Sequence, residues 1–128
     1  MSDVKDFGLP DPFSVLVVED EPMIAMDIQL MLEQQGLRVL GPVGTVERAL
    51  GLLERALPDV AVLDLNLRGR LVTPVAERLR NLGVPFIIAS ADPSVAGSEA
   101  VFAGAQGIGK PIQEQHLLAA LHHAARLQ

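Results

Sequence analysis

Acidic, hydroxyl and basic side chains stand where short apolar runs of this chain end. They are Glu19 and Asp20 after the first run, Asp64 in the third, Ser90 after the fourth and Lys110 after the fifth. An ionised carboxylate inside an apolar run such as Asp64 in residues 60–65 is costly to desolvate without a partner. Carboxylates brought close together also raise one another's pKa unless a cation lies among them. These residue types therefore indicate a site for a hard, oxygen-preferring cation, Mg²⁺ or Mn²⁺, beside a carboxylate nucleophile.

Two further side chains would complete such a site. Lys110 offers a mobile ammonium that suits a phosphoryl oxygen or the Asp64 carboxylate itself. Ser90 offers a hydroxyl donor for the same group. A carboxylate nucleophile with a metal ion, a cation and a hydroxyl is the equipment of phosphoryl transfer, in which positioning and charge neutralisation lower the barrier.

A parallel sheet is the scaffold that would bring these residues together. The predicted strands are residues 14–20, 37–43, 60–65, 84–90 and, with poor propensity, 105–109. Helical patterns alternate with them, which predicts an α/β fold with a doubly wound five-stranded parallel sheet, helices on both faces and the flavodoxin-like strand order 2-1-3-4-5. The second strand contains Gly41 and Pro42, which favours a place near an edge. Because strands one and three are neighbours in this order, Glu19, Asp20 and Asp64 would meet at one edge.

Apolar residues at helical spacing and capping residues mark the helices between the strands. Pro22 suits a first helical position and Gly36 a C-terminal stop. Thr45 is expected to cap a second helix whose buried stripe reaches Leu57, and Thr73 to cap a third. Residues 92–104 are only weakly helical because Pro, Gly and small residues interrupt them, and residues 113–127 form the last helix.

Length and charge narrow the class of protein. The 128 residues suit one domain, which we place at residues 14–128 after an N-terminal extension, residues 1–13. A net charge of -6 argues against direct binding of nucleic acid, and the absence of Cys excludes disulfides and makes zinc and iron–sulfur sites improbable. No apolar run approaches the roughly 18 residues of a membrane span, and the N-terminus has no secretory signal pattern, so we expect a cytoplasmic protein.

From about Ser14 to the last helix, the chain resembles the receiver domain of two-component response regulators. The match rests on order and spacing, since gaps of 44, 26 and 20 residues separate Asp20, Asp64, Ser90 and Lys110. The resemblance implies that Asp64 accepts the phosphoryl group, that Asp20 binds Mg²⁺ directly and that Glu19 binds it through water. It further implies roles for the backbone carbonyl of Asn66 as a metal ligand, for Ser90 and the small Ala91 in closing on the phosphoryl group, and for the pair Lys110-Pro111, joined by a cis peptide bond.

Two positions depart from the pattern of that family. Gly107 stands where many receivers have Tyr or Phe, three positions before the lysine, and the chain contains no Tyr. The rotation of an aromatic side chain by which the family often signals phosphorylation is therefore absent at this site. Arg68 stands where Pro is frequent, which we expect to alter the rigidity of the loop and to leave the chemistry intact.

The resemblance implies a switch rather than an enzyme. A histidine kinase or a histidine phosphotransfer protein would donate the phosphoryl group in a Mg²⁺-dependent reaction. The expected output surface is the face formed by the helix in residues 92–104, the fifth strand and the last helix. Output would pass to a downstream protein that the sequence does not identify, or act through a homodimer on that face.

Other functions remain open at this point. The chain is alternatively a constitutive interaction module that needs no phosphorylation, or the receiver part of a larger DNA-binding regulator or hybrid kinase. A flavodoxin-like cofactor protein is disfavoured, because the loop after the first strand is acidic instead of rich in Gly, Ser and Thr. A phosphohydrolase with an Asp nucleophile is disfavoured because Asn66 cannot act as the general acid or base.

Overall fold

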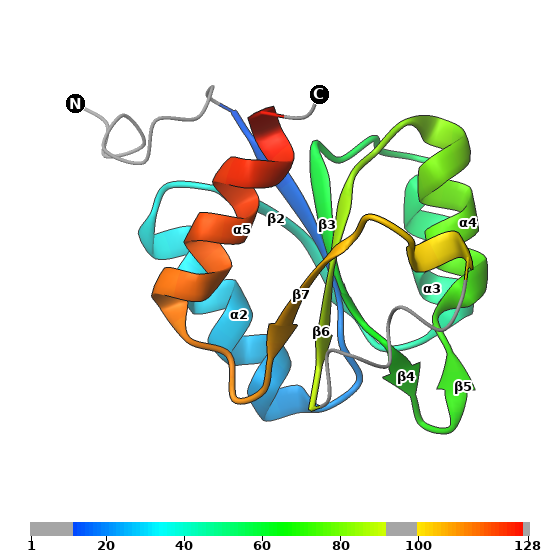
Figure 1. The fold of residues 1–128 in the computed structure, drawn as a ribbon, viewed down its shortest axis with the longest axis horizontal. Coiled ribbons are helices and arrows are strands. Elements are labelled where there is room, and N and C mark those ends of the chain that lie inside the picture. The colour runs from blue at the N-terminus through cyan, green and yellow to red at the C-terminus, as the bar shows by residue number, and fades with distance from the viewer. Residues whose placement is uncertain (1–11, 92–99, 127–128) are drawn as a thin grey trace.

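The fold is a parallel sheet between two layers of helices (Figure 1). The computed structural model describes residues 12–91 and 100–126. Five parallel strands lie in the order β2-β1-β3-β6-β7, namely β1 (Ser14–Val18), β2 (Arg38–Val43), β3 (Val60–Asp64), β6 (Phe86–Ser90) and β7 (Gln106–Gly109). This confirms the predicted doubly wound sheet, its flavodoxin-like order and the edge position of the second strand.

Each face of the sheet packs against two helices. Helices α2 (Pro22–Gln34) and α5 (Glu114–Arg126) cover one face, and α3 (Val46–Leu53) and α4 (Thr73–Leu82) cover the other (Figure 1). Side chains alternate along a strand, so β1 sends Val15 and Val17 to the first face and Leu16 and Val18 to the second. All five residues of β3 are buried, which fits a central strand covered on both faces. None of the helices in the described ranges is long and apolar enough to cross a membrane.

The helix ends confirm one predicted cap and correct two other expectations. The Thr45 hydroxyl accepts a hydrogen bond from the backbone N–H of Arg48 at 3.1 Å and caps α3, as predicted. Thr73 is not a cap: it is the first residue of α4, whose N-cap is Val72 without a side-chain bond. The stripe predicted to reach Leu57 is also wrong, because α3 ends at Leu53 and Leu57 is 65% exposed.

The segment after β6 contains the predicted fifth strand and a short helix. Residues 92–99, most of the weakly helical stretch, lie outside the described residues, and Ala100–Phe102 form a short 3-10 helix, η2. Strand β7 forms because its backbone pairs with that of β6, although Ile108 is the one buried residue among its four. The Lys110-Pro111 peptide bond is cis, as expected.

A short hairpin beyond β3 is absent from the prediction. Strands β4 (Asn66–Leu67) and β5 (Arg70–Leu71) pair antiparallel, and the two residues between them, Arg68 and Gly69, have φ of 54° and 84°. Two positive φ angles are what a type I′ hairpin turn requires. Figure 1 places the hairpin beyond the carboxyl ends of the central strands.

Candidate functional site: an acidic pocket at the carboxyl ends of the strands

The ends of β1, β3 and β6 and the residue after β7 surround one open pocket. Its volume is about 460 Å³, and it is lined by Glu19, Asp20, Glu21, Ile24, Asp64, Leu65, Asn66, Ser90, Ala91 and Lys110. Seven of the predicted site residues therefore meet at this edge. The other two do not line it: Gly107 lies in β7 opposite Ile88, and Pro111 follows the cis bond.

Three carboxylates and one ammonium form the centre of the pocket. Glu19, Asp20 and Asp64 each place one carboxylate oxygen within 4.8 Å of the others. Lys110 Nζ lies 2.9 Å from Glu19 Oε1 and 3.3 Å from Asp64 Oδ1. The second Glu19 oxygen, Oε2, accepts a hydrogen bond from the backbone N–H of Glu21 at 3.0 Å. Glu19 and Asp64 are the two buried charged residues among those described.

Local backbone packing explains how these charges come so close. Asp64 is the last residue of β3, and its partner across the sheet is Ala89 of β6, next to Ser90. After β2 the chain passes against the acidic loop, where a Cβ on Gly44 would lie only 3.3 Å from the Cα of Asp20. Glycine therefore allows this loop to approach Asp20 without a side chain between them.

The electrostatics of the pocket penalise the ionised form of Asp64. Burial and, after it, the charge of Glu19 raise the pKa of Asp64 to about 6, although Lys110 and the Asn66 backbone N–H act in the opposite direction. Burial alone would lower the pKa of Lys110, but its bond to Glu19 and the charge of Asp64 outweigh burial and raise it. At neutral pH the pocket therefore holds an ionised Asp64 in an environment that disfavours its charge.

The donor set fits a hard divalent cation. All three side-chain donors are oxygen atoms of carboxylates, and the Lys110 ammonium together with the largely exposed Arg68 guanidinium does not balance their charge. Oxygen ligands and uncompensated negative charge are what Mg²⁺ selects, and it commonly keeps several waters and few protein ligands. The pocket is open to solvent along Asp20 and Asn66, so such waters have room.

The contact of Arg68 with the acidic residues was not predicted from the sequence. Arg68, at the hairpin turn, lies with its Nε 3.4 Å from Asp20 Oδ2. The sequence does contain a signal for the turn, because Arg68-Gly69 separates two short pairs that each contain a Leu. No local pattern identifies Asp20 as the partner, since the two residues belong to different loops.

The profile of the response regulator receiver domain matches residues 15–122, which include every residue of the acidic pocket. The chain belongs to the response regulator receiver family. Receivers are the domains of response regulators through which kinases or phosphotransfer proteins act in two-component systems. The three-carboxylate pocket with its lysine therefore lies in a domain of the expected family.

Individual relatives agree with this assignment. The chain is 30% identical over 122 residues to the nitrate/nitrite response regulator protein NarL of Escherichia coli, which covers 90% of this chain and 56% of NarL. It is 36% identical to SdrG of Sphingomonas melonis, with a TM-score of 0.76 over 94% of this chain and all of SdrG. The response regulator PhyR of Brucella abortus is 26% identical, with a TM-score of 0.81 over 96% of this chain and 51% of PhyR.

The curated relatives are longer than this chain. The chain spans 56% of NarL and 29% of the transcriptional regulatory protein PdtaR of Mycobacterium tuberculosis, to which it is 36% identical over 59 residues. The shared part is the receiver, so the relatives' further activities do not follow for this chain.

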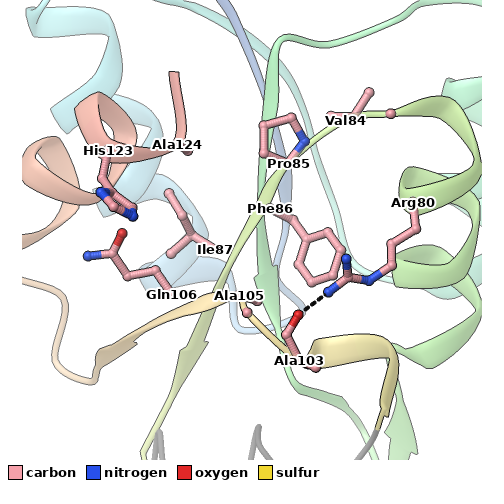
Figure 2. Close-up of a pocket in the computed structure, with 12 residues that line it drawn as sticks. Arg80, Val84, Pro85, Phe86, Ile87, Ala103, Ala105, Gln106, His123 and Ala124 are labelled. Atoms are coloured by element: carbon pink, nitrogen blue, oxygen red, sulfur yellow. Dashed lines mark hydrogen bonds between the residues drawn. The ribbon is translucent and has the colours of Figure 1, made fainter. Parts of the chain in front are cut away.

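A second cavity lies at the opposite end of the sheet from the acidic pocket. It has a volume of about 410 Å³ and lies at the amino ends of β6 and β7, between α4 and α5. Figure 2 shows His123 and Gln106 on one side of it and Phe86 and Arg80 on the other. Its lining contains no carboxylate and no Ser, Thr or Lys, so it offers neither the metal ligands nor the nucleophile of the acidic pocket.

Proposed function

We propose that this receiver is a phosphorylation switch that accepts a phosphoryl group on Asp64 in a Mg²⁺-dependent reaction. The observation that carries the proposal is the placement of Asp64: a buried carboxylate, 3.3 Å from an ammonium and within 4.8 Å of two further carboxylates, on an open pocket. An Asp with a purely structural role usually has partners that stabilise its ionised form and lower its pKa. The pKa of Asp64 is raised instead, so its surroundings disfavour its charge. Perturbed carboxylates in a pocket are typical of functional sites.

The reaction is a displacement at phosphorus. An Asp64 oxygen attacks the phosphoryl group of a donor phosphohistidine, a P–O bond forms and the P–N bond breaks. The electron pair of the P–N bond returns to the imidazole nitrogen, which takes up a proton from solvent. Lys110, already in contact with Asp64, is positioned to bind a phosphoryl oxygen, and Ser90 supplies a hydroxyl from the end of the neighbouring strand.

The acidic residues would hold the cation. Glu19, Asp20 and Asp64 supply carboxylate oxygens, and the backbone carbonyl of Asn66 is the fourth proposed ligand. When bound, Mg²⁺ would neutralise the charge that accumulates on the phosphoryl oxygens and lower the pKa of Asp64. Because the phosphoryl group stays on the chain's own side chain, we propose a switch and not a turnover enzyme.

An apolar stripe beside the pocket supports a protein as the donor. Met23, Met26 and Leu30 of α2 are 74%, 59% and 49% exposed and follow one another at helical spacing. Helix α2 starts at the rim of the pocket, where Glu21 and Ile24 line it. An exposed apolar stripe next to a reactive group fits contact with the protein that carries the phosphohistidine.

The output surface remains a proposal. The expected face combines η2, β7 and α5 with residues 92–99, which lie outside the described residues. Gly107 of β7 is exposed, so no aromatic side chain from this position reports the state of Ser90. We propose that movement of Ser90 and Ala91 toward the phosphoryl group acts through the backbone that links β6 to η2, and that a partner protein or a second copy of the chain binds the altered face.

Intact mass measurement after incubation with acetyl phosphate tests the proposal. The native chain should gain one phosphoryl group in the presence of Mg²⁺, and none after chelation with EDTA. Asp64→Asn, which keeps the shape of the side chain, should gain none in either condition. An adduct that forms without a metal ion or on Asp64→Asn would contradict the mechanism, and the lack of any adduct on the native chain with Mg²⁺ would favour a constitutive interaction module.

A further inference from the structure

Arg68 is the counter-ion of the one carboxylate in the trio that Lys110 does not contact. Lys110 Nζ binds Glu19 and Asp64, and Arg68 Nε lies 3.4 Å from Asp20 Oδ2. The Asp20 side chain is 16% exposed and that of Arg68 is 76% exposed. A cation therefore already lies against Asp20 from the solvent side of the pocket.

The hairpin fixes where Arg68 lies. Asn66 Oδ1 accepts a hydrogen bond from the Gly69 backbone N–H at 2.7 Å across the turn. Buried Leu67 anchors one strand of the hairpin, and Arg70 of the other strand forms an ion pair with Glu47 of α3. That contact lowers the pKa of Glu47. Arg68 therefore lies in a turn with left-handed backbone whose position these contacts restrain.

A divalent cation and the Arg68 guanidinium compete for the same carboxylate. A metal ion bound by Asp20 takes up electron density from its oxygens and repels a second positive charge at short range. Removal of Arg68 would therefore free Asp20 and remove this repulsion, and both effects strengthen metal binding.

We propose that Arg68 is a built-in competitor that occupies Asp20 in the metal-free protein and sets the affinity of the site for Mg²⁺. This inference rests on the metal site of the proposed function. The chain binds Mg²⁺ more weakly than its three carboxylates alone would, and the bound cation displaces Arg68 from Asp20. The same charge remains at the rim of the pocket, so Arg68 is a residue of the hairpin that tunes the affinity for the cation and does not itself react.

Titration of the 128-residue chain with MgCl₂, followed by amide chemical shifts in ¹H–¹⁵N NMR spectra, tests this inference. Arg68→Gln should tighten Mg²⁺ binding about two- to fivefold, which is about 0.4–1 kcal/mol and the range of exposed ion pairs. Arg70→Gln is the control, because it removes the same charge from the same hairpin but from a residue that pairs with Glu47, and it leaves buried Leu67 and the Gly69–Asn66 hydrogen bond to hold the turn. It should leave the affinity close to that of the native chain.

The dependence on salt separates an electrostatic role from a structural one. The difference between the native chain and Arg68→Gln should shrink as KCl is raised, because salt screens exposed charges. Equal or weaker Mg²⁺ binding by Arg68→Gln, or an equal gain in Arg70→Gln, would overturn the inference. If the native chain and Asp20→Asn both fail to bind Mg²⁺, the proposed function itself fails.

Discussion

The two ends of the sheet differ in how completely their charged side chains are compensated. At the carboxyl ends, three carboxylates face one ammonium and one exposed guanidinium, and the pKa of Asp64 is raised. At the amino ends, the Arg80 guanidinium donates to the carbonyl oxygens of Val101, at 2.6 Å, and Ala103, and lies 5.3 Å from the centre of the Phe86 ring (Figure 2). One end leaves charge incompletely compensated, and the other satisfies it.

Aromatic packing adds to this difference. Phe86 and Phe102 contact edge to face, with ring centres 6.4 Å apart at 87°, and both are buried. Through Phe102 and Arg80, helix η2 is held against α4 and β6. The amino end thus stabilises the segment that leads into β7. At the carboxyl end, the buried charge of Asp64 destabilises the folded state, and binding of a cation there would offset this. The residues that stabilise the amino end of the sheet are therefore distinct from those of the acidic pocket.

The largest expected effect lies at the stable end. Phe102→Ala should lower the free energy of unfolding by about 3–5 kcal/mol, because it removes a buried ring and leaves a cavity beside Phe86. Urea denaturation measures the loss, and Phe102→Leu, which fills most of the space, should cost much less. Mg²⁺ affinity of the folded Phe102→Ala protein should stay native. A change in that affinity would show that the two ends are coupled and would break the comparison.

Ionisation of Asp64 should make the folded protein less stable as the pH rises, which is the opposite of the usual effect of a paired carboxylate. Because the folded-state pKa of Asp64, about 6, exceeds its ordinary 3.8, the folded state holds the proton more tightly. The contribution of Asp64 to stability is therefore fully present below about pH 3.8 and is lost as the pH rises through about 6.

Asp64→Asn isolates this contribution. In metal-free buffer at pH 7, it should be more stable than the native chain, and the advantage should vanish as the pH falls to about 4. Thermal unfolding of both proteins across this range measures the difference. A less stable Asp64→Asn at pH 7 would mean that Lys110 compensates the buried carboxylate fully, and the contrast between the two ends would fail.

The smallest expected effect is a displacement of the Asp64 titration. Glu19→Gln removes a neighbouring negative charge and should lower the pKa of Asp64, whereas Lys110→Gln removes the ammonium and should raise it. The side-chain carboxyl carbon of Asp64, followed by ¹³C NMR in metal-free buffer, reports both shifts. Two variants that move the pKa in the same direction would contradict the arrangement of charges described for this pocket.

Much of the fold could be predicted from local patterns. Continuous apolar runs identified β1, β3 and β6, because a strand covered on both faces needs apolar residues at every position. The cap at Thr45 and the stop at Gly36, whose φ is 79°, followed from backbone chemistry within a few residues. The strand order then brought Glu19, Asp20, Asp64 and Lys110 to one edge, as predicted, although their roles in phosphoryl transfer stay a prediction.

The errors share a physical cause. Leu57 continues a helical stripe in the sequence, but the last turn of α3 tightens and the helix ends at Leu53. The backbone N–H groups of Glu54 and Arg55 donate to carbonyls only three residues back. Thr73 carries a capping side chain, yet α4 begins one residue earlier than a Thr73 cap would allow. In both places several local outcomes are compatible with the residues, and packing of the neighbouring elements selects one.

The sequence by itself determined the alternation of strands and helices, and with it the edge at which the acidic residues and Lys110 gather. The tertiary structure stabilises the strand that was predicted at residues 105–109 with poor propensity, because β6 supplies its hydrogen bonds. Only the tertiary structure decided that Arg68 faces Asp20. That ion pair depends on a left-handed turn in one loop and an acidic residue in another, and no pattern along the chain encodes a distance between two loops.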